Sequence, residues 1–507
     1  MKRDMKLRPL AVALAVIALL LVAACSGSQD TGAPASEPNR NSGRGIPSPA
    51  QGGNTEGSTE RSGEQDATAT REQDATAGQI STFALDVDTA SYGYSKRILQ
   101  EGRLPEPDQV RPEEFVNAFR QDYREPEDDG FTVNMDGARM PENGTALLRV
   151  GLQTRGADAR TRRPANLTFV VDVSGSMGEP GRLDLVREAL HKLVDQLGPG
   201  DQVSVVAFSG EAEVIVPMTS ATGRDRLHAA VERLAVRDST NLEAGLTSGY
   251  AEASQSFRPV ATNRVILLSD GLANMGDTSW QGILDKVKGF AGKQVTLLCV
   301  GVGRDYGDQL MEQLADNGDG AAVYVSSVDD ARKVFVEQLA TNLDLRARDA
   351  KAQVVFNPSV VESYHLVGYE NRQIATEDFR DDAKDGGEIG PGHSVTALYE
   401  VRLRGGASGQ LATATVRWQD PDTRDPAETS HSLETTDLAA SLWRESSARF
   451  QVDVVAAAFA ENLRTRERFA GAEIRELAEH ATRLAATTED AAVTELARLI
   501  DRASSLG

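Results

Sequence analysis

Apolar runs alternate with segments of helical spacing through the middle of the chain. The first run, at 167–173, is rich in Val and Phe and predicts a strand buried on both faces. After it, apolar residues recur every three or four positions from 183 to 197, as in a helix with one buried side. Further strands are expected at 203–208, 213–218, 264–269, 295–300 and 322–325, and further helices at 223–234, 242–256, 280–290, 310–314 and 331–342. This alternation predicts an α/β fold with a doubly wound, mainly parallel sheet.

A different pattern lies on both sides of this segment. Apolar and polar residues alternate along four stretches, which predict antiparallel strands: 147–152, 352–356, 394–401 and 412–418. We expect them to form β-structure built from both flanks of the α/β segment. From residue 437 onward the pattern is helical, with helices expected at 438–463, 472–485 and 490–503.

The first residues carry a sorting signal. Lys and Arg precede an apolar segment at 10–24, and small residues stand directly before Cys25. The segment resembles a bacterial lipobox, which implies cleavage before Cys25 and acylation of its sulfur and of the new amino terminus. An ordinary secretory signal peptide and a short membrane anchor are the alternatives. The resemblance predicts a lipid-anchored protein on the extracytoplasmic face of the cell membrane.

The pattern divides the chain into six regions. Residues 26–79 contain almost no large apolar side chains, so they cannot offset their ordering entropy by burial and are predicted to be a disordered tether. The regions are a signal peptide at 1–25, the tether at 26–79, an N-terminal region at 80–163, the α/β domain at 164–342, a β-rich region at 343–436 and a helical region at 437–507.

Charge narrows the classes of partner. The net charge of −22 over 507 residues argues against nucleic-acid binding, which needs a concentrated basic face.

Cys299 lies in an apolar strand and is expected to be a buried small hydrophobic residue.

The candidate chemistry lies where the first strand of the α/β segment ends. Asp172, Ser174 and Ser176 alternate along the turn that follows, so their oxygens can converge on one point. Open α/β sheets bind ligands at the carboxyl ends of their parallel strands. Oxygen ligands in a compact turn suit a hard cation such as Mg²⁺.

This turn resembles a known family motif. Residues 172–176 match the DxSxS of the von Willebrand factor type A (VWA) domain, Thr240 is placed like that family's metal-binding threonine, and Asp270 is placed like its closing aspartate. Outside the α/β segment, residues 81–92 and the stretch with Asn357, Pro358 and 368–372 are similar to the terminal regions of YfbK-type bacterial VWA lipoproteins.

The resemblance implies a metal-dependent adhesion site. The hydroxyl groups of Ser174, Ser176 and Thr240 would contact the ion, and Asp172 and Asp270 would act mainly through bound water. The ion would be Mg²⁺, with Mn²⁺ and Ca²⁺ as alternatives, and its exchangeable position would accept an Asp or Glu from a protein partner. Such a protein binds without catalysing a reaction.

Three other interpretations compete with adhesion. The hydroxyl groups of Ser174, Ser176 and Thr240 could cap helices, with Asp270 in an ordinary turn. The protein could be a structural envelope scaffold with a vestigial metal site. A serine hydrolase would need a His near Ser176, and none of the six His residues lies in an expected strand-to-helix loop.

Overall fold

The computed structural model describes most of the chain after residue 78. The described ranges are 79–85, 87–140, 144–156, 163–271, 274–279, 281–283, 285–286, 295–303, 308–316, 321–325, 334–335, 345–382, 384, 386–421, 423–466 and 473–506. Cys25, the apolar segment before it and the tether lie outside these residues, as do most of the helices expected at 280–290 and 331–342. Within the described part, the strands form three sheets.

The middle of the chain forms a sheet of six strands, in the order β6-β5-β4-β7-β8-β9. Its strands are β4 (Ala165–Asp172), β5 (Gln202–Phe208), β6 (Ala212–Ser220), β7 (Thr262–Ser269), β8 (Val295–Val302) and β9 (Ala321–Val325). All neighbours are parallel except β5 and β6, which are antiparallel at one edge. Pro217 lies in this edge strand, where the missing N–H does not interrupt the sheet. The predicted doubly wound, mainly parallel sheet is confirmed.

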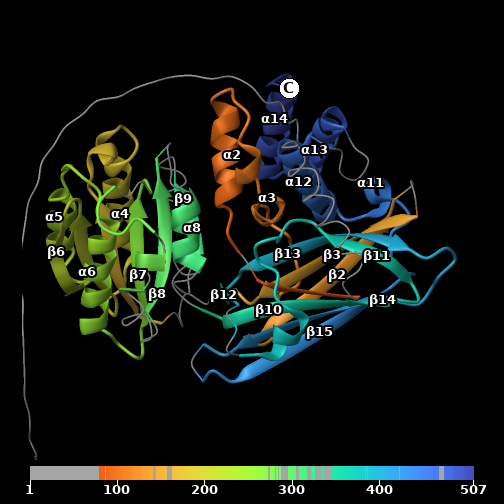
Figure 1. Ribbon diagram of the computed structural model, residues 1–507, viewed down its shortest axis with the longest axis horizontal. Helices are drawn as coiled ribbons and strands as arrows, with labels where there is room; N and C mark the ends of the chain where they lie inside the picture. Colours follow the sequence, from red (N-terminus) through yellow and green to blue (C-terminus); the bar gives the residue numbers. More distant parts are fainter. Residues whose placement is uncertain are drawn as a thin grey trace, which may run out of the picture. The chain divides into compact units, whose positions relative to one another are not determined.

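Helices cover both faces of this sheet (Figure 1). They are α4 (Leu183–Gln196), α5 (Arg224–Glu232), α6 (Leu242–Gln255) and α8 (Asp308–Asp316). Phe169 of β4 packs in one core with Leu190 of α4, whereas the next residue, Val170, packs in the opposite core with Leu246 of α6. Because successive side chains of a strand point to opposite faces, both faces of β4 must be apolar.

The flanks of the chain form two antiparallel sheets. One has the order β1-β10-β14-β15 with β12 beside β10, and the other has the order β11-β13-β3-β2. The strands of the first are β1 (Ile80–Ala84), β10 (Ala347–Phe356), β12 (Gly387–Ile389), β14 (Gln410–Gln419) and β15 (Pro426–Glu434). Those of the second are β2 (Phe131–Arg139), β3 (Thr145–Thr154), β11 (Val361–Leu366) and β13 (Ser394–Leu403).

The expected β-structure from both flanks is therefore confirmed, although it divides into two sheets. β3 precedes the α/β segment and pairs with β13, which follows it. The strands β2, β11, β12 and β15 were not predicted. β15 is exposed along most of its length, so it shows no alternation of apolar and polar residues.

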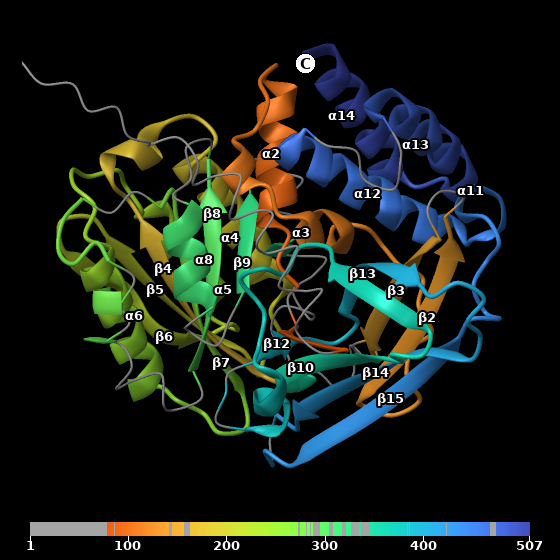
Figure 2. The same ribbon diagram turned by 45° about the vertical axis from the view of Figure 1, so that its right-hand side comes forward.

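The strand β3 is buried on both faces (Figure 2). Leu148 and Val150 point into the core between the two antiparallel sheets, which they share with Val354 of β10. Leu147 points the other way, into a core shared with Phe459 of the C-terminal helices. β3 therefore contributes to both cores, and it connects the two packed antiparallel sheets (the β-sandwich) to the C-terminal helices.

The helical C-terminus consists of α11 (Leu442–Glu445), α12 (Ala448–Thr465), α13 (Ile474–Thr488) and α14 (Ala491–Leu506). The prediction of one helix over 438–463 is wrong, because α11 ends at Glu445 and Ser447 caps the start of α12: its hydroxyl oxygen accepts a hydrogen bond from the N–H of Phe450 at 3.2 Å. Two short N-terminal helices, α2 (Ala90–Gln100) and α3 (Pro112–Asn117), share the apolar core of this region.

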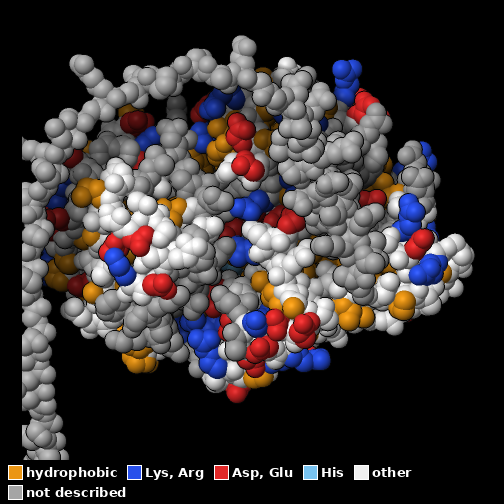
Figure 3. Space-filling model, viewed as in Figure 1, with side chains coloured by type: hydrophobic (Ala, Val, Ile, Leu, Met, Phe, Trp, Pro, Cys, Tyr) orange, Lys and Arg blue, Asp and Glu red, His pale blue; other side chains and the backbone are white. Residues whose placement is uncertain are grey.

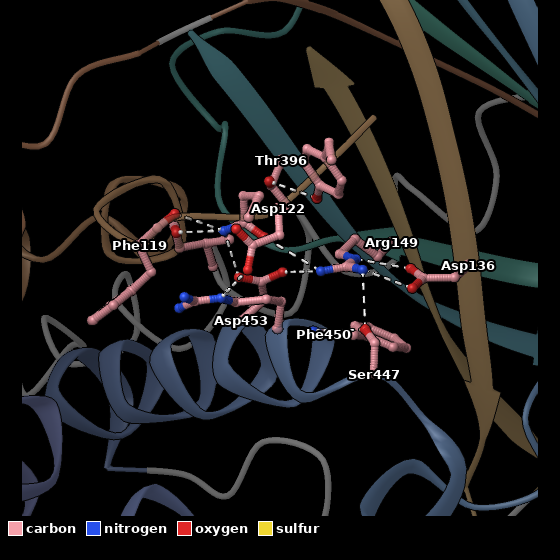
Figure 4. A network of polar contacts seen from close by, with 12 residues as sticks. Phe119, Asp122, Asp136, Arg149, Thr396, Ser447, Phe450 and Asp453 are labelled. Atoms are coloured by element: carbon pink, nitrogen blue, oxygen red, sulfur yellow. Dashed lines mark hydrogen bonds and ion pairs between the residues drawn. The ribbon is translucent and has the colours of Figure 1, made fainter. Parts of the chain in front are cut away.

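One buried polar cluster lies between β3 and α12 (Figure 4). Arg149 donates to both carboxylate oxygens of Asp136, at 2.8 and 2.7 Å, and to Asp453 at 2.8 Å. Gln121 donates to the other oxygen of Asp453 at 2.7 Å. Because Arg149 and Asp453 are nearly inaccessible to water, each depends on these partners.

Among the residues coloured by type in Figure 3, basic side chains lie beside acidic ones. Of the helices that the structure describes, none combines the length and the apolar character needed to cross a bilayer.

Candidate functional site

The candidate site lies at the carboxyl edge of the six-stranded sheet. β4 runs parallel to β5 and β7, so Asp172, Phe208 and Ser269 end their strands at the same edge. Asp172 is fully buried, and both of its carboxylate oxygens accept hydrogen bonds. Oδ1 accepts from the N–H of Ser174 at 2.8 Å, and Oδ2 accepts from the hydroxyl of Ser269 at 2.6 Å. These bonds fix the carboxylate beneath the turn.

The two serines of the turn face each other. Their hydroxyl oxygens lie 3.0 Å apart; Ser174 is buried and Ser176 is partly exposed. Ser174 precedes a short 3₁₀ turn over Gly175–Gly178, and its side chain makes no capping hydrogen bond there. The capping interpretation therefore fails for Ser174, and the pair of hydroxyl groups remains as a source of neutral oxygens beside Asp172.

Thr240 lies in the loop before α6. It is buried, and its backbone is held by Asn274, whose side-chain oxygen accepts from the Thr240 N–H at 2.9 Å. The cap of α6 is Asn241, whose side chain accepts from the N–H of Ala244 at 3.1 Å. Capping by Thr240 is thus excluded. The loop lies against the Asp172 turn, because the N–H of Arg237 donates to the carbonyl of Val173 at 2.6 Å.

Asp270 follows β7 and is also fully buried. Its Oδ2 accepts from Nη1 of Arg182 at 2.8 Å, and the same Nη1 donates to the carbonyl of Ser176 at 3.0 Å. Its Oδ1 is buried and accepts no hydrogen bond from the residues that the structure describes. One arginine therefore connects Asp270 to the serine turn, and one carboxylate oxygen is left uncompensated.

Arg182 is a further residue of the site, and the sequence alone does not indicate it. Its side chain is 3% exposed, and it also contacts Glu179 at 2.9 Å. It directly precedes α4, where it marks the end of the turn, and no recognisable motif includes it. The one signal in the sequence is its position: Arg182 stands directly before the first apolar residue of the helix, close in sequence to the predicted site.

Burial and charge set the protonation of Asp172. Removal from water is the largest effect and raises the pKa of the Asp172 carboxyl to about 6. The neighbouring charge of Asp270 raises it further, whereas the hydrogen bonds from Ser269 and Ser174 oppose the shift. A nearby cation would favour the ionised form.

Known proteins match most of the described chain. The family model of the YfbK C-terminal region matches residues 341–410, the von Willebrand factor type A domain model matches 167–272, and a von Willebrand factor model matches 60–149. The uncharacterized protein YfbK of Escherichia coli is 35% identical over 336 residues, which are 64% of this chain and 58% of YfbK. The chain contains a VWA domain and, after it, a region of the YfbK type.

The chain is also similar to more distant proteins. Human inter-alpha-trypsin inhibitor heavy chain H4 is 28% identical over 250 residues, covering 45% of this chain and 27% of that protein. A von Willebrand factor type A protein from Catenulispora acidiphila, of known structure, has a TM-score of 0.44 and 16% identity, covering 73% of this chain and 89% of its own. The chain spans less than two thirds of the length of the two curated relatives.

The donor set of the VWA domain fits a hard cation. Two carboxylates and the hydroxyl-bearing residues Ser174, Ser176 and Thr240 surround the carboxyl edge, and Oδ1 of Asp270 is an orphaned buried acceptor. In the described part of the chain, no group of three or more His, Cys, Asp or Glu side chains is arranged to hold a metal ion, so a cation at this edge depends on the hydroxyl groups.

Proposed function

We propose that this protein binds a protein partner through a divalent-metal-dependent adhesion site in its VWA domain, and that it is not an enzyme. Asp172, Ser174, Ser176, Thr240 and Asp270 would hold the ion, Mg²⁺ by preference, with Mn²⁺ or Ca²⁺ as alternatives. VWA domains typically mediate protein–protein interaction, and this coarser function comes with the family. The observation that carries the finer proposal is the orphaned, buried Oδ1 of Asp270 at the edge where the serine turn lies.

The residues explain why the site would bind an acidic side chain. The hydroxyl oxygens of Ser174 and Ser176 are neutral, and both oxygens of Asp172 are already occupied by hydrogen bonds from Ser174 and Ser269. A bound divalent cation would carry a positive charge that its direct protein ligands neutralise only in part. A carboxylate from a partner is the natural group to complete that charge.

Calorimetric titration with Mg²⁺ and Mn²⁺ tests the metal site. The wild-type protein should bind one ion, and Asp172→Ala and Ser174→Ala should each lose binding. Asp225→Ala is the matched control, because Asp225 is an exposed acidic residue of α5 that lies away from the site. Loss of binding in the control as well would show that the ion is held by the general acidity of the surface.

The partner is tested by capture from envelope extracts. The protein with Mg²⁺ should retain a binding partner that EDTA releases and that Asp172→Ala fails to retain. Modification of the acidic side chains of the partner should abolish the binding. Capture that is indifferent to EDTA would contradict an acidic group bound through a metal.

Arg182 gives a specific reason to consider a second function, a structural envelope scaffold with a vestigial metal site. Its guanidinium already contributes a positive charge to Asp270, at 2.8 Å. If this ion pair replaces the metal, the wild-type protein should bind neither Mg²⁺ nor Mn²⁺. The same titration therefore separates the scaffold from the adhesion site.

We also propose that the protein is anchored to the extracytoplasmic face of the cell membrane through lipidated Cys25. The support is the lipobox-like segment that ends at this residue. Mass spectrometry of the mature protein should find an acylated amino-terminal Cys25, and Cys25→Ala should leave the signal uncleaved. An unmodified amino terminus elsewhere would indicate an ordinary secretory signal.

A further inference from the structure

Two exposed apolar side chains, those of Val236 and Met275, lie beside the candidate metal site. Their exposed fractions are 45% and 44%, and they are two of the six large hydrophobic residues that are exposed in the described part of the chain. Val236 comes four residues before Thr240, and Met275 comes five residues after Asp270. A single exposed apolar residue needs no explanation, but two beside the same candidate ligands indicate a surface that another molecule covers.

Val236 lies next to the serine turn. The N–H of the following residue, Arg237, donates to the carbonyl of Val173 at 2.6 Å, so this loop is fixed against the turn. A Cβ atom placed on Gly178 would lie 3.4 Å from both Cγ atoms of Val236. Gly178 is an exposed residue two positions after Ser176, so the methyl groups of Val236 lie beside the backbone that presents the Ser176 hydroxyl.

Met275 lies next to another candidate ligand, Thr240. The N–H of Met275 donates to the carbonyl of Thr240 at 3.0 Å. A Cβ atom placed on Gly210 would lie 4.0 Å from the sulfur of Met275, and Gly210 follows β5, the strand that ends beside Asp172. The candidate site therefore has one exposed apolar side chain by the serine turn and another by Thr240.

The charged side chains around the site limit the chemistry of a partner. Arg237 pairs with Glu213 at 2.8 Å. Arg182 pairs with Glu179 at 2.9 Å. Because both arginines are paired with acids and Asp238 adds an exposed negative charge, a second carboxylate of the partner would gain no attraction there. These charges favour a partner segment that has a single acidic residue with apolar neighbours.

We propose that Val236 and Met275 form an apolar rim that binds large apolar residues next to the acidic side chain of the partner. The inference rests on the proposed function, since the ion holds the acidic group, and it adds which segment is selected. The occupant is a segment of a partner protein that has one Asp or Glu and a Leu, Ile, Val, Met or Phe within two positions of it. Burial of apolar surface stabilises the complex, and the flexible Met275 side chain can adapt to different apolar residues.

Selection from a phage library of random heptapeptides tests the rim without a known partner. The full-length protein is loaded with Mg²⁺, and bound phage are released with EDTA, so only metal-dependent binders are recovered. The recovered peptides should contain Asp or Glu with a large apolar residue within two positions. The double variant Val236→Thr/Met275→Gln keeps the approximate size of both side chains and makes them polar. It should select acidic peptides that lack the apolar neighbour.

Synthetic versions of the selected peptides measure the contribution of the rim. Replacing the apolar neighbour by Gly should weaken binding to the wild-type protein at least about tenfold, and binding to the double variant by less than about twofold. Val260→Thr is the matched control, because Val260 is 67% exposed and precedes β7, at the sheet edge opposite the site. This control should bind the peptides as the wild type does, and the Mg²⁺ affinity should be the same in all three proteins.

The outcomes separate the rim from the metal site. Acidic peptides without an apolar neighbour, or equal losses in the wild type and the double variant, would overturn the rim and leave the metal-dependent adhesion site in place. Apolar peptides that stay bound in EDTA would overturn it too, because the surface would then act without the ion. The same holds for a protein that binds Mg²⁺ and retains no peptide. A protein that binds neither Mg²⁺ nor peptides would contradict the proposed function, and the rim with it.

Discussion

At the residue scale, the two buried carboxylates of the candidate site differ in how their charge is compensated. Asp172 receives hydrogen bonds from Ser174 and Ser269, which are neutral groups. Asp270 receives one from Arg182, a charged group, and has a second oxygen with no hydrogen bond from the described residues. Burying a carboxylate is costly unless it is paired, so the site is poised for a positive charge.

The pKa of Asp172 predicts how metal binding depends on pH. Burial raises this pKa to about 6 in the metal-free protein, and an ion at the site requires the ionised carboxylate. The affinity for Mg²⁺ should therefore be constant above about pH 7 and fall by about tenfold per pH unit below pH 6. Calorimetry from pH 5 to pH 8 measures this. Asp172→Asn should bind weakly with no such slope, and a wild-type affinity that is equal at pH 5 and pH 7.5 would contradict the assignment.

Without metal, the stability of the fold depends on pH in the opposite direction. A carboxyl whose pKa is raised on folding binds more protons in the folded state than in the unfolded state between about pH 4 and pH 6. The contribution of Asp172 to the free energy of unfolding of the metal-free protein therefore decreases as the pH rises through this range. A bound cation should remove that decrease, because it favours the ionised form.

Arg182 should act as a competitor for the cation. Replacing it in Arg182→Gln removes a like charge from the site, so the affinity for Mg²⁺ should rise several-fold. Without metal, the same variant should unfold more easily, by about 3–5 kcal/mol, because Asp270 becomes a buried charge with no partner. Paired denaturation curves with and without Mg²⁺ measure both effects. A variant that loses metal binding would instead show that Arg182 supports the site.

These residues also show what a sequence can reveal about a site. Asp172, Ser174, Ser176, Thr240 and Asp270 stand directly after expected strands or before an expected helix, where chain order alone places them at one sheet edge. Arg182 could not be predicted, since its role depends on a long side chain folding back across the turn.

At the scale of elements, the helix α6 packs so closely on the sheet that it needs glycine. A Cβ atom on Gly249 would lie 2.2 Å from Cγ2 of Val170 on β4. Gly249→Ala should therefore lower the free energy of unfolding by about 1–3 kcal/mol, because either the helix or the buried valine must shift. Chemical denaturation measures this change.

Gly93 in α2 is the matched control. A Cβ atom there would meet only Tyr324, at an ordinary contact distance of 3.5 Å. Gly93→Ala should raise the free energy of unfolding by about 0.5–1 kcal/mol, through the better helix propensity of alanine. Equal effects of the two substitutions, in sign and size, would show that the close approach of α6 and β4 is not a constraint.

The elements that were predicted correctly are those with an uninterrupted pattern of apolar residues. The parallel strands are continuous apolar runs, and α13 and α14 have clean apolar stripes. The break before α12 was missed because it spans only Ser446 and Ser447, and helix-forming sequence with apolar residues stands on both sides of it. β2 was missed because Gly137 interrupts its alternation; a Cβ there would lie 2.6 Å from Leu438.

At the scale of the whole molecule, β3 connects the β-sandwich to the C-terminal helices through both apolar and charged contacts. Arg149 points from β3 toward α12 and meets Asp453, which is completely buried (Figure 4). The aromatic rings of Tyr123 and Phe450 each lie 5.1 Å from the guanidinium carbon, so the charge is enclosed between them. The helical region is therefore held to the sheet by an interaction that fails when one partner is removed.

Asp453→Ala should weaken this attachment strongly. The substitution removes the acceptor of two buried donors, Nη1 of Arg149 and Nε2 of Gln121, and should lower the free energy of unfolding by about 3–5 kcal/mol. Asp122→Asn is the control, because Asp122 pairs with Arg449 at 3.0 Å near the surface and should contribute at most about 1 kcal/mol. Urea denaturation, followed by the signals of both the helices and the sheets, measures the two variants.

A double variant separates the two causes of the Asp453→Ala effect. If the loss comes from stranded buried donors, Arg149→Met combined with Asp453→Leu should restore most of the stability, because apolar groups of similar volume then fill the space. Asp136 can lose Arg149 without a large penalty, since its side chain is 40% exposed and remains hydrated. If the double variant is as unstable as Asp453→Ala, the charged cluster itself determines how α12 is seated on β3, and no apolar pair can replace it.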